Sequence, residues 1–286
     1  MTANPRTPKT LISAESLRAL QASADPALLV DVSFDLADVE AGRRAWQGGH
    51  LPGSVYLHLD DDLSAPKTGA NGRHPLPDRP AFAALLGRIG VTPQSAVVAL
   101  DAQGGVYAAR LWWMLRWIGH ADAAVLDGGV AAWQRAGGPL VTDQPSRPSV
   151  APYPERTPLT AQLDATELAR RLGRLRLLDA RAPERFRGEV EPLDAVAGHI
   201  PGATNRFHRL NLDADGRFKP ASQLRAEFEA LLGADSAAAL AHQCGSGVTA
   251  CHNLLAMEHA GLAGSALYPG SWSEWSADSS RPVARG

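Results

Sequence analysis

The 286-residue chain repeats its own pattern, and this repetition constrains the fold more than any other feature. The sequence Gly-His-Leu-Pro-Gly-Ser at residues 49–54 recurs as Gly-His-Ile-Pro-Gly-Ala at residues 198–203. Three further segments have a counterpart in the second half of the chain. Residues 28–32 correspond to 176–180, and residues 105–110 correspond to 247–252. The pair Gly128 and Trp133 corresponds to Gly270 and Trp275. The offsets are all about 140 to 150 residues, too long for a solenoid repeat, so the chain is predicted to hold two copies of one domain.

A proline-rich segment separates the two copies. Residues 144–158 contain five prolines, which disfavour both a helix interior and a central strand, so an extended linker is expected there. The predicted boundaries are a first domain at residues 1–143, the linker at 144–158 and a second domain at 159–286.

Within each copy, short apolar strands alternate with helical patterns. In the first copy, residues 96–100 read as a strand, 106–118 as a helix and 124–126 as the next strand. Such alternation is typical of an α/β domain with a parallel sheet and helices on both faces. Three neighbouring tryptophans in that helix, Trp112, Trp113 and Trp117, are expected in the core.

Composition narrows the choice of partners. The formal net charge is −2, which provides no basic footprint for nucleic acid, and no apolar run approaches the roughly 20 residues that span a bilayer. Residues 1–10 lack the apolar stretch of a secretory signal. The only cysteines are Cys244 and Cys251, with no disulfide or metal-ligand spacing, so a reducing cytoplasm is expected, with no metal and no cofactor.

Cys244 begins the segment with the clearest chemical meaning. An apolar stretch at residues 237–241 precedes it as an expected strand, and an expected helix at residues 248–260 follows. Glycines at 245 and 247 allow a tight loop whose N–H groups point inward, and positive φ costs glycine little. Such a loop at a helix start stabilises a thiolate, the nucleophilic form of cysteine. The alternative is a small buried core cysteine.

Residues 244–249, Cys-Gly-Ser-Gly-Val-Thr, resemble the active-site loop of the rhodanese superfamily, and most closely that of its 3-mercaptopyruvate sulfurtransferases. The turn at residues 198–203 and the segment 268–272 with Trp275 match further motifs of that family, in the same order. The resemblance implies two tandem rhodanese domains and transfer of a sulfane sulfur.

The same resemblance implies roles for individual residues. Cys244 would carry the sulfur as a persulfide, Arg185 would bind the anionic end of the donor, and Asp60 and His74 would form a proton relay with Ser246. The N–H groups of the loop would cradle the persulfide, as an oxyanion hole does. The loop residues concerned are Gly245, Gly247, Val248 and Thr249. The implied partners are a small anionic sulfur donor and an acceptor such as cyanide, a small thiol or thioredoxin.

Other residues in these motifs favour structural roles. Arg181 is expected to pair with Asp179 or a neighbouring carboxylate. His50 and His199 occupy equivalent turns in both copies, including the copy without a thiol, which favours a structural function.

Three departures from the family pattern bear on activity. The first copy has Asp101 where the second has Cys244, and an aspartate cannot accept a sulfur. Mercaptopyruvate enzymes usually carry a second arginine where this chain has the acidic segment 189–194, so carboxylate binding is expected to be weak. Thiosulfate enzymes resemble Cys-Arg-Lys-Gly-Val-Thr, whereas Gly245 and Ser246 are neutral, which favours 3-mercaptopyruvate over thiosulfate.

Two rival functions are considered. In phosphatases of the same fold, five residues separate the catalytic cysteine from an arginine that binds phosphate. Counted from Cys244, the residue at that arginine's position is Ala250. A persulfide carrier or binding module without catalytic activity would not need the complete cysteine loop, although a carrier role toward a protein acceptor stays open.

Overall fold

The computed structural model describes residues 7–145 and 147–286, which divide into two compact units. The first unit comprises Met1–Ser64, Pro77–Leu159 and Ala214–Phe218, and the second comprises Ala65–Leu76, Thr160–Asp213 and Lys219–Gly286. Residues 1–6, on which most of the expectation about a secretory signal rests, and Ser146 of the expected linker lie outside the described residues.

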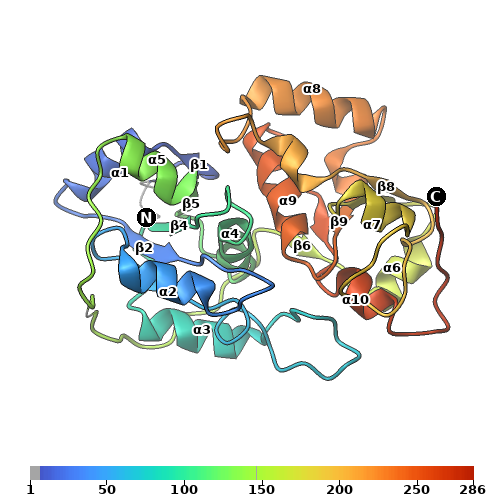
Figure 1. Ribbon diagram of the computed structural model, residues 1–286, viewed down its shortest axis with the longest axis horizontal. Helices are drawn as coiled ribbons and strands as arrows, with labels where there is room; N and C mark the ends of the chain where they lie inside the picture. The colour runs from blue at the N-terminus through green and yellow to red at the C-terminus, as the bar shows by residue number, and fades with distance from the viewer. Residues whose placement is uncertain (1–6, 146) are drawn as a thin grey trace. The chain divides into compact units, whose positions relative to one another are not determined.

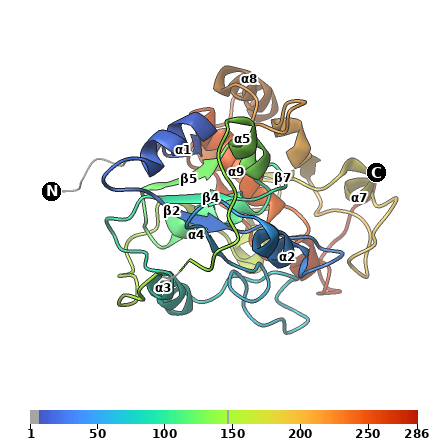
Figure 2. The same ribbon diagram turned by 60° about the vertical axis from the view of Figure 1, so that its left-hand side comes forward.

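The first unit is built on a five-stranded parallel sheet with the order β1-β5-β4-β2-β3 (Figure 1). Its elements are β1 (Leu11–Ile12), α1 (Ala14–Gln21), β2 (Leu28–Asp31), α2 (Ala41–Gly48), β3 (Val55–Tyr56), α3 (Arg79–Arg88), β4 (Val97–Leu100), α4 (Ala108–Trp117), β5 (Ala123–Leu126) and α5 (Gly129–Arg135). Figure 2 shows β5, β4 and β2 running side by side.

The second unit repeats this arrangement with the strand order β6-β10-β9-β7-β8, again all parallel. Its elements are β6 (Ala161–Gln162), α6 (Ala165–Arg171), β7 (Arg176–Asp179), α7 (Pro183–Arg187), β8 (Ala203–Asn205), η1 (His208–Asn211), α8 (Ala221–Leu232), η2 (Ala237–Ala239), β9 (Leu240–Gln243), α9 (Thr249–His259), β10 (Ala266–Leu267) and α10 (Ser271–Trp275). The predicted α/β architecture of two tandem domains is therefore confirmed.

The strand order explains why helices cover both faces of each sheet. In the first unit the chain moves along the sheet from β1 to β2 and β3, then reverses to β4 and β5. Because parallel crossovers are right-handed, α1 and α2 lie on one face and α3 and α4 on the other. Buried aliphatic and aromatic side chains fill the space between sheet and helices, and Trp112 and Trp113 are fully buried, with Trp117 nearly so, as predicted.

The ends of the strands and helices agree with the predicted ones except at one strand. The strands at 96–100 and 124–126 and the helices at 106–118 and 248–260 are found within two residues of their predicted ends. The strand expected at residues 237–241 begins only at Leu240, because Ala237–Ala239 forms a 3₁₀ turn closed by the bond from Ala239 N–H to Ser236 O. Alanine favours strands weakly, so three alanines do not extend the strand.

The described residues of the expected linker contain no helix or strand and lie along the first unit. Val150 N–H donates to Gly87 O and Tyr153 N–H donates to Ala83 O, each at 2.9 Å. The domain limits at 143/144 and 158/159 stay predictions. In the described part of the chain, no helix is long and apolar enough to cross a membrane.

Candidate active site

Cys244 lies at the carboxyl end of β9, in the loop that leads into α9. Residues 244–249 are called the Cys244 loop here. Cys244 is 2% exposed, and its Sγ accepts a hydrogen bond from the N–H of Gly247 at 3.1 Å. The carboxyl ends of parallel strands are where α/β proteins bind ligands, because the loops there meet helix N-termini. The fold therefore presents Cys244 at the edge of the sheet that suits an anionic ligand.

The start of α10 fixes the Cys244 loop. Cys244 N–H donates to Ser271 Oγ at 3.1 Å, Trp272 N–H donates to Cys244 O at 3.0 Å, and Ser273 N–H donates to Gly245 O at 2.9 Å. Ser271 has a φ of 55°, which a non-glycine residue adopts at a cost. Its hydroxyl also donates to Tyr268 O at 2.9 Å, so the strained residue joins β10, the loop and α10.

The two loop glycines have different requirements. Gly247 has a φ of +75°, and a Cβ there would lie 2.2 Å from Pro269 O, so only glycine fits. Gly245 is not among the residues of positive φ, contrary to the expectation that both glycines curl the backbone in this way. A Cβ on Gly245 would instead lie 2.9 Å from Nη2 of Arg73, so this position keeps space for side chains above the loop.

The equivalent loop of the first unit holds a carboxylate. Asp101, at the end of β4, accepts hydrogen bonds from the N–H groups of Gln103 and Gly105 on Oδ1 and of Tyr107 and Ala108 on Oδ2, at 2.8 to 2.9 Å. Backbone N–H groups that converge in this way form an anion site. In the first copy the aspartate fills its own anion site, which explains physically why that copy has no place for a sulfur.

His74 and Ser246 are brought together, as predicted. His74 Nδ1 lies 2.7 Å from Ser246 Oγ, and both side chains are buried. His74 belongs to Ala65–Leu76, a segment from the first half of the sequence that packs as part of the second unit. Asp60 belongs to the first unit, and its place in a relay stays a prediction. Val248 is buried as the N-cap of α9, and Thr249 is its first residue.

Arg185, on α7, reaches the space above Gly245. A Cβ on Gly245 would lie 3.5 Å from its Nη1 and 3.6 Å from its Nη2. Glu191 holds the guanidinium through contacts of 3.3 Å to Nε and 2.6 Å to Nη2, and Asp194 lies 3.4 Å from Nη2. The acidic segment 189–194 therefore positions Arg185.

A second guanidinium, not predicted from the sequence, lies over the same glycine. Arg73 pairs with Asp194 through an Nη1–Oδ1 contact of 2.5 Å, and its Nη2 faces Gly245. The sequence signal was weak: Arg73 directly precedes His74, but nothing in the pattern indicated that this segment packs with the second half.

Burial makes the Asp194 carboxyl easier to protonate than that of an ordinary aspartate. Desolvation raises the pKa of Asp194, and Glu191 raises it further, while Arg73 and Arg185 act in the opposite direction. Protonation of this carboxyl would release positive charge beside the Cys244 loop.

The remaining motif residues stabilise the frame. Arg181 pairs with Asp179 through Nε and Nη2 contacts of 2.6 to 3.1 Å, as predicted. His199 stacks on Phe186 with centroids 3.9 Å apart, and in the first unit His50 stacks on Trp46 at 4.2 Å. Equivalent packing in both copies agrees with the predicted structural function of these histidines.

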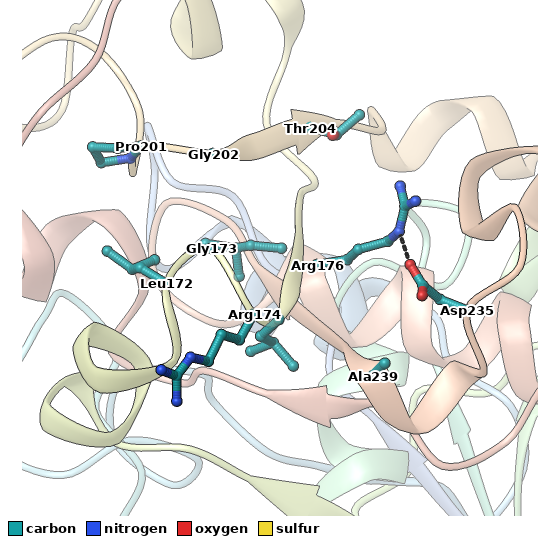
Figure 3. Close-up of a pocket in the computed structure, with 11 residues that line it drawn as sticks. Leu172, Gly173, Arg174, Arg176, Pro201, Gly202, Thr204, Asp235 and Ala239 are labelled. Carbon is teal, nitrogen blue, oxygen red and sulfur yellow. Dashed lines mark hydrogen bonds and ion pairs between the residues drawn. The ribbon is translucent and has the colours of Figure 1, made fainter.

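A separate hollow of about 400 Å³ lies at the opposite edge of the second sheet. Its lining includes residues that precede the amino ends of β7, β8 and β9 (Figure 3). Arg176 is paired there with Asp235, and the Arg174 side chain extends away from that pair. This hollow is remote from the carboxyl end of β9, so it is not assigned to the chemistry of Cys244.

Fold and site together define a class: a tandem α/β protein with one complete cysteine loop and one loop filled by aspartate. Sequence comparison agrees, because the Rhodanese-like domain matches residues 13–136 and 164–278. The chain belongs to the two-domain sulfurtransferases of the rhodanese family.

Three relatives illustrate the similarity. The "Probable 3-mercaptopyruvate sulfurtransferase" of Pseudomonas aeruginosa is 48% identical over 283 residues, covering 96% of this chain and 99% of the relative. The "Putative thiosulfate sulfurtransferase SseB" of Mycobacterium tuberculosis is 40% identical, covering 97% and 98%. The solved 3-mercaptopyruvate sulfurtransferase of Leishmania major superposes with a TM-score of 0.86 at 29% identity, covering 98% of this chain and 78% of that one.

Proposed function

We propose that this protein transfers the sulfur of 3-mercaptopyruvate to a thiophilic acceptor through a persulfide on Cys244. The observation that carries the proposal is the Cys244 thiol hydrogen-bonded by the N–H of Gly247, with the guanidiniums of Arg185 and Arg73 over the adjacent Gly245. A nucleophile, an anion cradle and cations for the donor are what sulfur transfer requires.

In the first half-reaction the Cys244 thiolate attacks the donor sulfur. The new S–S bond forms as the C–S bond of 3-mercaptopyruvate breaks, and the electron pair passes to carbon as the enolate of pyruvate. That enolate gains the proton that the donor thiol gives up, so the products are pyruvate and the Cys244 persulfide anion. In the second half-reaction cyanide attacks the outer sulfur, thiocyanate leaves and the Cys244 thiolate returns.

Ser246 and His74 are assigned to the proton transfer. The Ser246 hydroxyl hydrogen-bonds to His74, so histidine can replace the proton that serine gives to the enolate. Asp60 is proposed to orient His74. Because sulfite leaves thiosulfate as a stable anion, His74→Ala should lower kcat for 3-mercaptopyruvate by about 10²–10⁴-fold and affect thiosulfate far less. Equal losses of kcat with both donors would mean that His74 shapes the site and takes no part in proton transfer.

Thiosulfate is the second candidate donor. Two guanidiniums over Gly245 would suit a dianion, although the loop side chains themselves are neutral. Rates with both donors, measured side by side, decide between them, and kcat/KM is expected to be higher for 3-mercaptopyruvate.

Cys244→Ser and Cys251→Ser form a matched test of the persulfide. Both cysteines are buried and neither forms a disulfide, but Cys251 lies within α9 and its Sγ donates to Gly247 O at 3.3 Å. Cys244→Ser should abolish transfer, whereas Cys251→Ser should retain it. Incubation with donor should add a mass of about 32 Da, one sulfur, only where Cys244 is present. Transfer by the Cys244→Ser protein would refute the mechanism.

The acceptor and the compartment belong to the same proposal. Cyanide, a small thiol or thioredoxin would each attack the outer sulfur of the persulfide in the same way. A cytoplasmic location is proposed because neither cysteine forms a disulfide, as is usual in a reducing compartment.

A further inference from the structure

Ser271, the first residue of α10, has a backbone conformation that favours glycine. Its φ is 55°, and among the described residues it is the only one other than glycine with a positive φ. This conformation costs free energy for a residue with a side chain, because the Cβ crowds the backbone. A side chain kept at such a position indicates that the side chain has a function there.

The first copy, which lacks the thiol, has a glycine at the equivalent position. The repeat that aligns Gly128 with Gly270 also aligns Gly129 with Ser271. Gly129 has a φ of +56°, so the two copies share this feature of the backbone. The copy whose loop holds Asp101 thus has the residue that this φ favours, whereas the copy with the thiol accepts the strain.

The next backbone contact is the same in both copies. Trp272 N–H donates to Cys244 O at 3.0 Å, and Val130 N–H donates to Asp101 O at 3.2 Å. The fold therefore joins the start of this helix to its loop with either a serine or a glycine. Relative to glycine, a serine adds only a Cβ and a hydroxyl, so the reason for the strain lies in the hydroxyl.

The Ser271 hydroxyl holds the main chain of the nucleophile. Its single proton is donated to Tyr268 O at 2.9 Å, which leaves its oxygen to accept the hydrogen bond from Cys244 N–H at 3.1 Å. Ser271 and Cys244 are both buried. Because a buried N–H group that loses its acceptor costs free energy, this contact strongly favours one orientation of the Cys244 peptide.

The direction of the thiol depends on that orientation. The main chain of Cys244 is held on both sides, at its N–H by Ser271 and at its O by Trp272. With the main chain fixed, Sγ lies 3.1 Å from the N of Gly247 and accepts its hydrogen bond. Hydrogen bonds to sulfur favour the thiolate, which is the nucleophilic form, and a displaced Cys244 would lose this support.

We infer that Ser271 is a positioning residue for Cys244, and that the second copy keeps a strained serine because its hydroxyl fixes the direction of the nucleophile. Ser271 acts through the main chain of Cys244 and is not itself a catalytic residue. The inference rests on the proposed function for the reaction that Cys244 performs.

Ser271→Gly and Ser271→Ala separate the hydroxyl from the backbone conformation. Both remove the hydroxyl, so both should lower kcat for 3-mercaptopyruvate by about 10- to 100-fold, as expected when a buried hydrogen bond that orients the nucleophile is lost. KM should change much less, because no group over Gly245 is altered. Only glycine relieves the strain, so Ser271→Gly should unfold at a higher urea concentration than Ser271→Ala. Equal urea midpoints would contradict the strain at this residue.

Ser276→Ala is the matched control. Ser276 directly follows α10, and its hydroxyl donates to Trp272 O at 2.7 Å. The substitution therefore removes a serine hydroxyl from the same short helix without touching the Cys244 loop, and kcat should be retained.

Alkylation of Cys244 by iodoacetamide, without any donor, measures positioning separately from turnover. In a Cys251→Ser background Cys244 is the only thiol of the chain. The pH–rate profile of alkylation should move to higher pH in both Ser271 variants and stay in place in Ser276→Ala, because a weaker hydrogen bond from Gly247 N–H supports the thiolate less.

The alkylation profile also keeps this inference apart from the proposed function. If the wild-type protein transferred no sulfur from either donor, the proposed function would fail, while the profile would still test Ser271. An unchanged kcat and an unchanged alkylation profile in folded Ser271→Gly would overturn the inference.

Discussion

At the scale of single residues, Asp194 determines the balance of charge around the two guanidiniums over Gly245. Its carboxylate contacts Arg73 and Arg185, with Glu191 as the other nearby acid. Because burial raises the pKa of Asp194, this group gains its proton at a higher pH than an ordinary aspartate. Protonation removes one negative charge from the cluster of Arg73, Arg185, Glu191 and Asp194 and leaves it with a net positive charge, which would favour the anionic donor of the proposed function.

KM for 3-mercaptopyruvate should therefore fall as the pH is lowered toward the raised pKa of Asp194. Asp194→Asn should have a lower KM than the wild type at neutral pH and should lose much of this pH dependence, because the amide carries no charge. Asp235→Asn, which affects the remote pair with Arg176, serves as the control. A higher KM for Asp194→Asn would instead show that the charge of Asp194 is needed to position Arg73.

The residues of this site also show how much of it could be predicted from the sequence. Arg185 and Cys244 are contained in motifs, and the pair of Ser246 and His74 followed from the family pattern. Arg73 could not be found in this way, because its contact with Asp194 joins residues 121 apart through packing that no local pattern encodes.

At the scale of elements, the Cys244 loop depends on close backbone packing. Gly247→Ala meets two penalties, a φ of +75° and a Cβ only 2.2 Å from Pro269 O. The variant should lose about 2–4 kcal/mol of stability and most of its activity, because the loop must move to relieve the contact.

Gly173→Ala isolates the cost of the backbone conformation alone. Gly173 has a φ of +77°, in the same unit, and nothing lies within 4 Å of its Cβ position. Its cost should be about 1–2 kcal/mol, with activity retained. Urea unfolding and steady-state rates measure the difference, and equal behaviour of the two variants would mean that the Pro269 contact is unimportant.

Elements were predictable where their pattern is local. The strands and helices around the two loops follow from apolar alternation and glycine placement, and the duplicated strand order follows from the repeat. The inclusion of Ala65–Leu76 in the second unit was not predictable, because a polar, glycine-containing loop gives no signal of what it packs against.

At the scale of the whole molecule, the equivalent loops of the two copies have different lengths and different occupants. The second loop offers the N–H group of Gly247 to a thiol, and the first is filled by the carboxylate of Asp101. The aspartates that end β2 and β7 also differ between the two copies. Asp179 is paired with Arg181, whereas burial raises the pKa of Asp31 to about 6. A carboxyl with a raised pKa contributes stability at low pH that is lost as the pH rises through about 6.

The carboxylate of Asp101 should therefore be a major determinant of stability in the first unit. The Asp101 carboxylate accepts hydrogen bonds from four backbone N–H groups. In Asp101→Asn the side-chain NH₂ replaces one of the two accepting oxygens, so about two buried N–H groups lose their acceptor. The expected loss is about 2–5 kcal/mol. Urea unfolding followed by tryptophan fluorescence measures this loss well, because the first unit contains Trp46, Trp112, Trp113, Trp117 and Trp133.

Asp35→Asn is the control for Asp101→Asn. Asp35 is exposed and accepts one hydrogen bond, from Ala37 N–H, so its substitution should change stability by less than about 0.5 kcal/mol. Equal, small effects of the two substitutions would show that the Asp101 loop tolerates an empty anion site, and the first copy would then have lost its cysteine without a structural gain.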